Sequence, residues 1–110
     1  MDGLNGQNGA AAGSAAVAFD QSGTPVITLT GEIDISNVDP LRATIEPVVE
    51  QAPERVVFDL SGLDFMDSSG IALLLHVAAK AGSVHLRGTS TLVRRILEVS
   101  VLSDILHIDS

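Results

Sequence analysis

Apolar and polar residues alternate along several segments of the chain, which is the pattern of half-buried β-strands. The first two segments, residues 14–20 and 26–30, are separated by the turn-like sequence Gln-Ser-Gly-Thr and a proline. Because so short a connection joins antiparallel neighbours, these strands are predicted to form a hairpin, with the first strand at the edge of the sheet. Further strands are predicted at residues 55–60, 83–87 and 105–108.

Apolar residues at helical spacing fill the segments between the later strands, at residues 38–52 and 71–81 and in a third helix that begins after Ser90. Pro47 lies inside the first of these helices, where it removes a hydrogen bond, so we expect a kink or an early end there. The order hairpin, helix, strand, helix, strand, helix, strand predicts an α/β fold. Its sheet should be mixed and mostly parallel, with an N-terminal antiparallel hairpin and helices packed on it.

Polar residues at the helix starts are predicted caps. The candidates for the first helix are Ser36, Asn37 and Asp39, and those for the third are Thr89 and Ser90. In the third helix the residues predicted to face the core are Leu92, Val93, Ile96, Leu97 and Ser100.

The second helix is almost wholly apolar, and two of its faces are candidates for the core. The spacing of a core face is followed by Ile71, Leu74, Leu75 and Ala78. Leu73 and Val77 lie on the opposite side, together with Ser69. Either another element covers Leu73 and Val77, or they form an exposed apolar strip. We predict that they are the apolar part of a partner-binding surface.

The start of the second helix carries the sequence Asp67-Ser68-Ser69-Gly70. Asp and Ser before an apolar helix are a strong helix-start signal, because a side-chain oxygen accepts a hydrogen bond from an unpaired N–H of the first turn. The same N–H groups and the helix dipole favour an anion, including a phosphate esterified to a serine. The alternative is a cap with no further role.

The composition limits the classes of function. A chain of 110 residues with 45% hydrophobic and 18% charged residues fits one folded domain, which we place at residues 14–110, after a disordered tail at residues 1–13. The formal net charge of −8 argues against nucleic acid or an anionic membrane as the main partner. The absence of cysteine, of a signal-peptide pattern and of a long apolar segment predicts a cytoplasmic protein.

No pattern of a catalyst is evident. The serine motif lacks the first glycine of a nucleophile elbow, and His76 lies two helical turns from the serines. Glycine-rich nucleotide motifs are absent, so neither a small-molecule substrate nor a cofactor is predicted. An acidic cluster could hold Mg²⁺, although solvated loop carboxylates are the expected state, and its members are Glu32, Asp34, Asp64 and Asp67. We predict a protein that is not an enzyme and has no metal.

Two motifs resemble those of a known family. Residues 63–70, Leu-Asp-Phe-Met-Asp-Ser-Ser-Gly, resemble the phosphorylation motif of the bacterial anti-sigma factor antagonists, which are small single-domain STAS proteins. Residues 31–34, Gly-Glu-Ile-Asp, are similar to that family's second signature, and the correspondence extends from about Ser14 to Ile108.

The resemblance implies a mechanism of partner switching. The unphosphorylated antagonist binds an anti-sigma factor that is also a Ser/Thr kinase, and a sigma factor is released. The kinase then phosphorylates the antagonist, which dissociates until a phosphatase restores it. The motif places the acceptor at Ser68, with Ser69 as second choice. Asp34 matches a family residue implicated in contact with the kinase, and we add Asp67 and Ser69 to the predicted partner-binding residues.

Two other functions remain open. The chain could be a STAS subunit docked constitutively on a transporter ATPase or another regulatory assembly, without phosphorylation. A serine hydrolase is the third hypothesis, which selective labelling of Ser68 or Ser69 by a fluorophosphonate would support.

Overall fold

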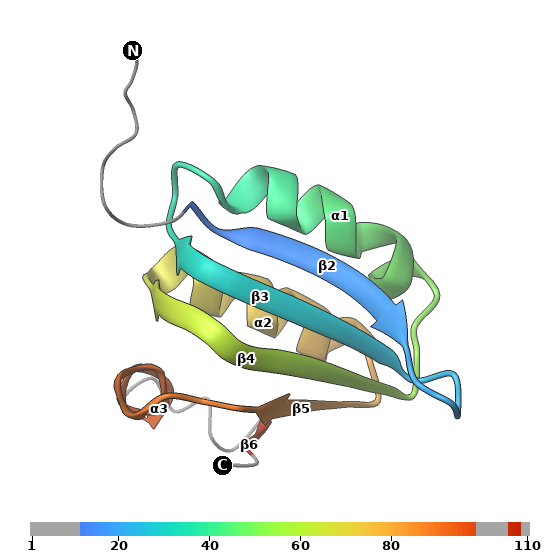
Figure 1. Cartoon of the computed structure of the whole chain (residues 1–110). Coiled ribbons are helices and arrows are strands. Elements are labelled where there is room, and N and C mark those ends of the chain that lie inside the picture. Colours follow the sequence, from blue (N-terminus) through green and yellow to red (C-terminus); the bar gives the residue numbers. More distant parts are fainter. Residues whose placement is uncertain (1–11, 99–105, 109–110) are drawn as a thin grey trace.

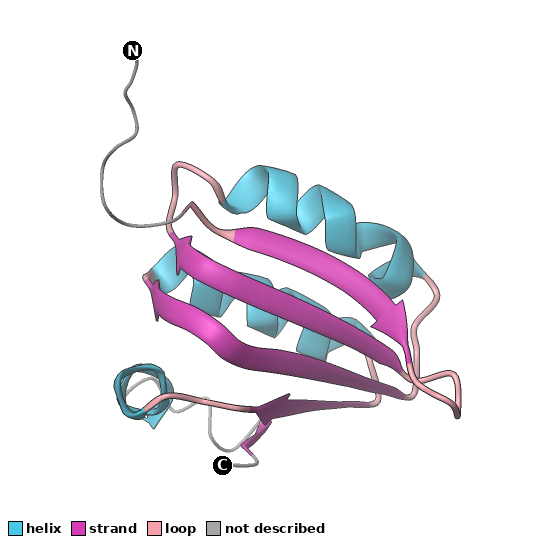
Figure 2. Cartoon of the chain, in the orientation of Figure 1, coloured by secondary structure: helices cyan, strands magenta, loops and turns pink. Residues whose placement is uncertain are grey.

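The computed structural model describes residues 12–98 and 106–108, and in this part of the chain five strands form one sheet in the order β2-β3-β4-β5-β6. Helices α1 and α2 lie side by side behind the sheet (Figure 1, Figure 2). The elements in chain order are β2 (Ser14–Phe19), β3 (Pro25–Ile33), α1 (Val38–Glu50), β4 (Arg55–Met66), α2 (Ser68–Lys80), β5 (Ser83–Arg87), α3 (Thr91–Glu98) and β6 (His107–Ile108).

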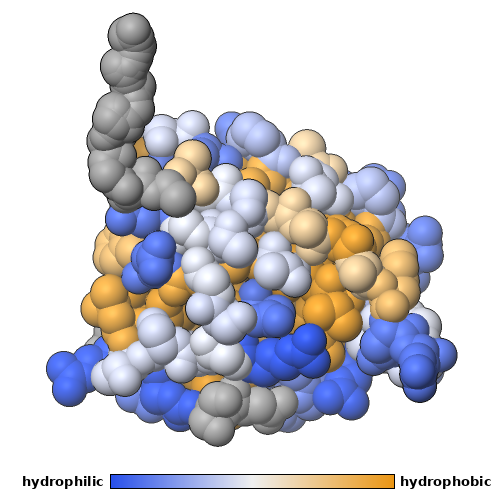
Figure 3. Space-filling model, viewed as in Figure 1, coloured by the Kyte–Doolittle hydropathy of each residue, from blue (hydrophilic) through white to orange (hydrophobic). Residues whose placement is uncertain are grey.

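The pairing of the strands confirms the predicted mixed sheet. The edge strand β2 runs antiparallel to β3, from Ser14 opposite Thr30 to Phe19 opposite Pro25. All other neighbouring strands in the described sheet are parallel. The face turned away from α1 and α2 is mixed in polarity, with polar residues across its middle (Figure 3).

Strands β3 and β4 are longer than predicted, and this positions the site. β4 continues past the predicted end at Leu60, through residues 61–64, and it ends at Met66 beside Ile33 of β3. The register between β3 and β4 shifts twice, each time with one extra residue in β4, and the second shift lies next to the positive-φ residue Gly31. These irregularities accommodate the longer β4 within the ladder. Both parallel strands therefore end at the same edge of the sheet, and their carboxyl ends are neighbours.

The core is aliphatic, as the composition requires, and Phe58 is its one large aromatic among the described residues. In α1 the predicted face is buried, with Val38, Leu41, Ile45, Val48 and Val49 inside. The expected early end at Pro47 is wrong, because α1 continues to Glu50 with Pro47 on its exposed side.

The prediction for α2 chose the wrong face. Its buried residues are Gly70, Leu73, Leu74 and Val77, with Leu73 only 1% exposed and Val77 fully buried. Ile71, Leu75 and Ala78, which were predicted to be in the core, are only partly buried. Leu73 and Val77 therefore form no exposed strip, and the interpretation in which other elements cover them is correct.

The end of the described chain agrees in part with the sequence pattern. Ser90 caps α3, because its Oγ accepts a hydrogen bond from the N–H of Val93 at 3.1 Å. Val93 and Leu97 are buried, but Leu92 is 53% exposed, contrary to prediction. Two predicted positions, residues 100 and 105, lie outside the described residues, as does most of the predicted tail. No helix among the described residues is long and apolar enough to cross a membrane.

Candidate partner-docking site

The ends of β3 and β4 bring the two predicted motifs together. Ile33 and Met66 are register partners, and the N–H of Asp67 donates a hydrogen bond to the carbonyl of Ile33 at 3.1 Å. Asp34 follows Ile33 and Asp67 follows Met66, so the two acidic segments leave the sheet as neighbours. The structure thus places the two motifs side by side.

Asp67 is the N-cap of α2, as predicted. Its Oδ1 accepts a hydrogen bond from the N–H of Ser69 at 2.8 Å, while its carbonyl accepts from the N–H groups of Gly70 and Ile71. Ser68 is the first residue of the helix and is exposed, whereas Ser69 is half-buried. The Ser68 hydroxyl bonds to no other described residue. The site thus presents, at a helix N-terminus, an exposed hydroxyl with no hydrogen bond to the part of the chain that the structure describes.

Gly70 allows the first turn of α2 to lie close to β4. A Cβ at this position would come within 2.7 Å of the Cβ of Met66, which is closer than packed carbon atoms approach. Met66 is itself buried, so it has little room to yield. The glycine therefore determines how closely α2 packs on the end of β4. This packing fixes the positions of Ser68 and Ser69 relative to the sheet.

We expect Gly70→Ala to destabilise the domain by about 1–3 kcal/mol, because the added methyl overpacks the contact with Met66. In an ordinary helix the same change is stabilising by about 1 kcal/mol, so the sign of the effect is diagnostic. Urea denaturation measures it, with Ser69→Ala as the neighbouring control. A Gly70→Ala protein as stable as the wild type would contradict the close approach.

The segment after β3 holds Asp34 in a fixed position. Oδ1 of Asp34 accepts hydrogen bonds from the backbone N–H of Ser36, at 2.9 Å, and from the Ser36 hydroxyl. The side chain of Asn37 accepts from the N–H of Asp34 at 2.9 Å and donates to the carbonyl of Glu32 at 2.8 Å. Asn37 is the N-cap residue of α1, but its side chain ties the loop to β3 rather than capping the helix.

These hydrogen bonds favour the charged form of Asp34. The side chain of Ser36, followed by its backbone N–H, lowers the pKa of the Asp34 carboxyl below its usual value. A fixed negative charge therefore stands beside the serine-bearing end of α2.

Ser36→Ala should raise the pKa of Asp34 back toward the ordinary aspartate value of about 3.9. The pKa of Asp34 is lower in the folded state than in the unfolded state. The ionised carboxylate therefore stabilises the fold fully at pH values above the unfolded-state pKa. The effect disappears as the pH falls through the folded-state pKa. NMR titration of the carboxyl carbon measures the shift, and Ser22→Ala, which removes the equivalent bond to Asp20, is the control. An unchanged Asp34 titration would contradict the assignment.

A shallow groove of about 180 Å³ joins the starts of α1 and α2. Its lining residues are Ile35, Val38, Asp39, Arg42, Ser69, Ala72 and Leu73. Ile35, at 78% exposed, is an exposed apolar residue of this groove, which the sequence patterns did not identify. The available signal was its position, an isolated aliphatic between the turn residues Asp34 and Ser36. Leu73 contributes to this groove only as part of its buried floor.

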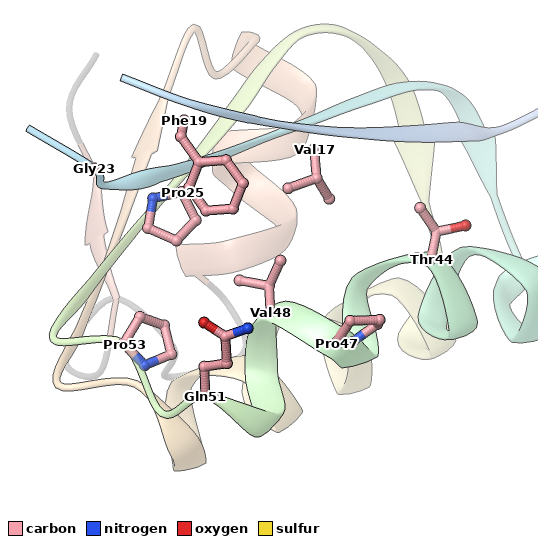
Figure 4. A pocket seen from close by; sticks show the side chains of 9 residues that line it. All are labelled: Val17, Phe19, Gly23, Pro25, Thr44, Pro47, Val48, Gln51 and Pro53. Carbon is pink, nitrogen blue, oxygen red and sulfur yellow. The ribbon is translucent and has the colours of Figure 1, made fainter. Parts of the chain in front are cut away.

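A second hollow, of about 410 Å³, lies at the opposite end of the strands (Figure 4). Phe19 and Pro25 of the hairpin and Val48 of α1 line it, with Pro47 and Pro53 nearby. It has no ionisable lining residue.

Within the described part of the chain, no group of three or more acidic or histidine side chains is close enough to hold a metal ion.

Comparison with known proteins matches this fold and motif arrangement to a family. A family model described as "Mlab, STAS domain" covers residues 17–107. The chain belongs to the STAS domain family. This STAS domain is 37% identical over 84 residues to the anti-sigma F factor antagonist of Lysinibacillus sphaericus, covering 72% of each chain. It is 30% identical over 91 residues to that of Paenibacillus polymyxa, covering 78% of each.

Solved structures of anti-sigma factor antagonists are also similar to this chain. An anti-sigma factor antagonist from Mycobacterium paratuberculosis superposes with a TM-score of 0.74 and 29% identity, covering 88% of this chain and 85% of that one. The anti-sigma factor antagonist SpoIIAA in its unphosphorylated form superposes with a TM-score of 0.66 and 26% identity, covering 88% of each chain. The phosphorylated form of SpoIIAA superposes with a TM-score of 0.64 and 26% identity, covering 88% of this chain and 92% of that one. The STAS domain is therefore an anti-sigma factor antagonist by family, and the family is regulatory rather than catalytic.

Proposed function

We propose that the protein binds an anti-sigma factor that is also a Ser/Thr kinase, that this binding releases a sigma factor, and that phosphorylation of Ser68 ends it. The observation that carries the proposal is the exposed Ser68 hydroxyl at the first residue of α2, with no hydrogen bond to the described residues. A phosphatase then restores the active form. The proposal places the protein in the cytoplasm, where sigma factors act, and needs no nucleic acid, membrane, small-molecule substrate or cofactor.

The docking surface is the groove and its rim. We assign contact with the partner to Asp34, Asp67 and Ser69, and we add the exposed Ile35 as the apolar contact. Leu73 and Val77 act from the core, by supporting the backbone of α2, and not by direct contact.

A phosphate on Ser68 would change the charge of this surface without changing the fold. Phosphoserine adds about −1.5 to −2 charge, which the N-terminus of α2 tolerates locally. Asp34 and Asp67 are already negative there, so a partner surface fitted to a neutral hydroxyl would meet a strong additional anion. The expected consequence is loss of the complex from a protein that remains folded.

The alternative functions have less support. In a serine hydrolase a histidine would face the serines, yet both ring nitrogens of His76 are engaged elsewhere, by Arg42 and Glu46. A constitutively docked STAS subunit of a transporter ATPase needs no free serine hydroxyl, and the relatives described above are antagonists.

Binding of the purified protein to the anti-sigma factor kinases of its source organism tests the proposal. The expected result is a complex with one kinase that dissociates after ATP is added and does not dissociate with a non-hydrolysable analogue. Failure of every kinase to bind, or a complex that ATP leaves unchanged, would contradict it.

A further inference from the structure

A hydrogen bond to His76 holds Arg42 of α1 against α2. Its Nη2 lies 3.2 Å from Nδ1 of His76, and Nε2 of the same ring lies 2.9 Å from Oε1 of Glu46. A guanidinium group only donates hydrogen bonds, so Nδ1 must present its lone pair. The proton is then on Nε2, where it is donated to Glu46. The two α1 residues thus fix one neutral tautomer of His76 between them.

Arg42 makes no ion pair with a carboxylate of the described residues. Within residues 12–98 and 106–108 the carboxylates within ion-pair distance of a basic or imidazole group are Glu46, beside His76, and Asp59, beside Arg87. Asp39 and Glu46 line a hollow together with Arg42 but lie beyond that distance from its guanidinium group. The described hydrogen-bond partner of Arg42 is Nδ1 of His76. In a chain of net charge −8, this arginine is therefore available to a carboxylate of another molecule.

Arg42 also lies beside the proposed docking surface. It lines the groove that contains Ile35 and Ser69, and no other described residue lining that groove is basic. Ser69 and His76 are seven residues apart, so they lie on the same side of α2, about 10 Å apart along its axis. The arginine therefore extends the docking surface from the serines toward the middle of α2.

We propose that Arg42 is a specificity-determining contact, which binds a carboxylate of the docked anti-sigma factor, and that the Glu46–His76 pair positions it. The inference rests on the proposed function, and charge complementarity identifies the chemistry of the partner group. A guanidinium has five donors in a fixed plane and matches a carboxylate bidentately. Because the hydrogen bond to His76 already restricts the Arg42 side chain, less side-chain entropy is lost when the partner's carboxylate binds.

The test compares variants for binding to the anti-sigma factor kinase that the wild type binds. Arg42→Ala should weaken binding about tenfold or more at pH 8, whereas the control Arg55→Ala, at the far end of β4, should not. His76→Ala should also weaken binding. His76→Gln, whose amide can accept from Arg42 and donate to Glu46, should restore binding.

Arg42→Ala binding as tightly as Arg55→Ala would overturn the contact, and His76→Ala binding as tightly as the wild type would overturn the role of His76. A long-range ¹H–¹⁵N spectrum of the free wild type at pH 8 should show the proton on Nε2; a proton on Nδ1 would also overturn that role. Absence of any complex with the wild type is a separate outcome, which refutes the proposed function and this inference with it.

Discussion

Leu73→Asp should unfold the domain. Leu73 is 1% exposed and belongs to the main core cluster, where it packs beneath the groove. An aspartate there would lose the burial of a leucine, about 2–3 kcal/mol, and would leave an unpaired carboxyl group in an apolar environment at a further cost of several kcal/mol. The sum is comparable to the whole stability of a domain of this size, about 5–15 kcal/mol.

The adjacent residue offers a matched control. Ala72 is exposed on the same turn of α2 and lines the same groove. Ala72→Asp should therefore remain folded, with a thermal midpoint near that of the wild type, while binding of the partner is weakened. Circular dichroism during heating distinguishes the two variants. A Leu73→Asp protein that unfolds cooperatively at the wild-type temperature and fails only in binding would show that Leu73 is a contact residue after all.

The error in the sequence prediction for α2 has a definite cause. In so apolar a helix two faces, 100° apart, both satisfy helical spacing, and they share Leu74. Hydrophobicity alone does not distinguish them. The deciding residue is Gly70, because only a face without a side chain at that position can approach Met66 so closely. Glycine carries no hydrophobic signal, so periodicity overlooked the residue that orients the helix.

Other features of the fold followed from the sequence because they depend on local chemistry. The hairpin follows from a short turn, and the cap at Asp67 follows from side-chain oxygens before an apolar run. The length of β4 did not follow, since Gly62 and Leu63 are held in the sheet by pairing with β3, while Ser61 and Asp64 lie at the register shifts. The contact between Arg42 and His76 joins residues 34 positions apart, and no pattern along the chain signals it.

Ser68→Ala should lock the proposed switch in its binding state. The change removes the hydroxyl but adds no charge, and the cap is unaffected because Asp67 provides it. The variant should therefore fold normally, bind the kinase as the unphosphorylated wild type does, and remain bound when ATP is present. Size-exclusion chromatography with and without ATP measures this. Release of the alanine variant by ATP would contradict the role of Ser68.

Ser68→Asp should weaken the complex, by about tenfold or more, while leaving the fold intact. An aspartate at the first residue of α2 is favoured by the helix dipole, so stability should be unchanged or slightly raised. The same carboxylate adds to the charges of Asp34 and Asp67 at the interface. It carries less charge than phosphoserine, so its effect should be smaller than that of phosphorylation.

The site of phosphorylation is the most direct test of the whole account. The wild type is incubated with its kinase and ATP, and mass spectrometry with fragmentation between Asp67 and Gly70 locates the added group. The account predicts one phosphate, on Ser68, and none on the Ser68→Ala protein. Phosphate on Ser69 alone would show that the motif was aligned to the wrong serine, and phosphate on neither residue would contradict the switch itself.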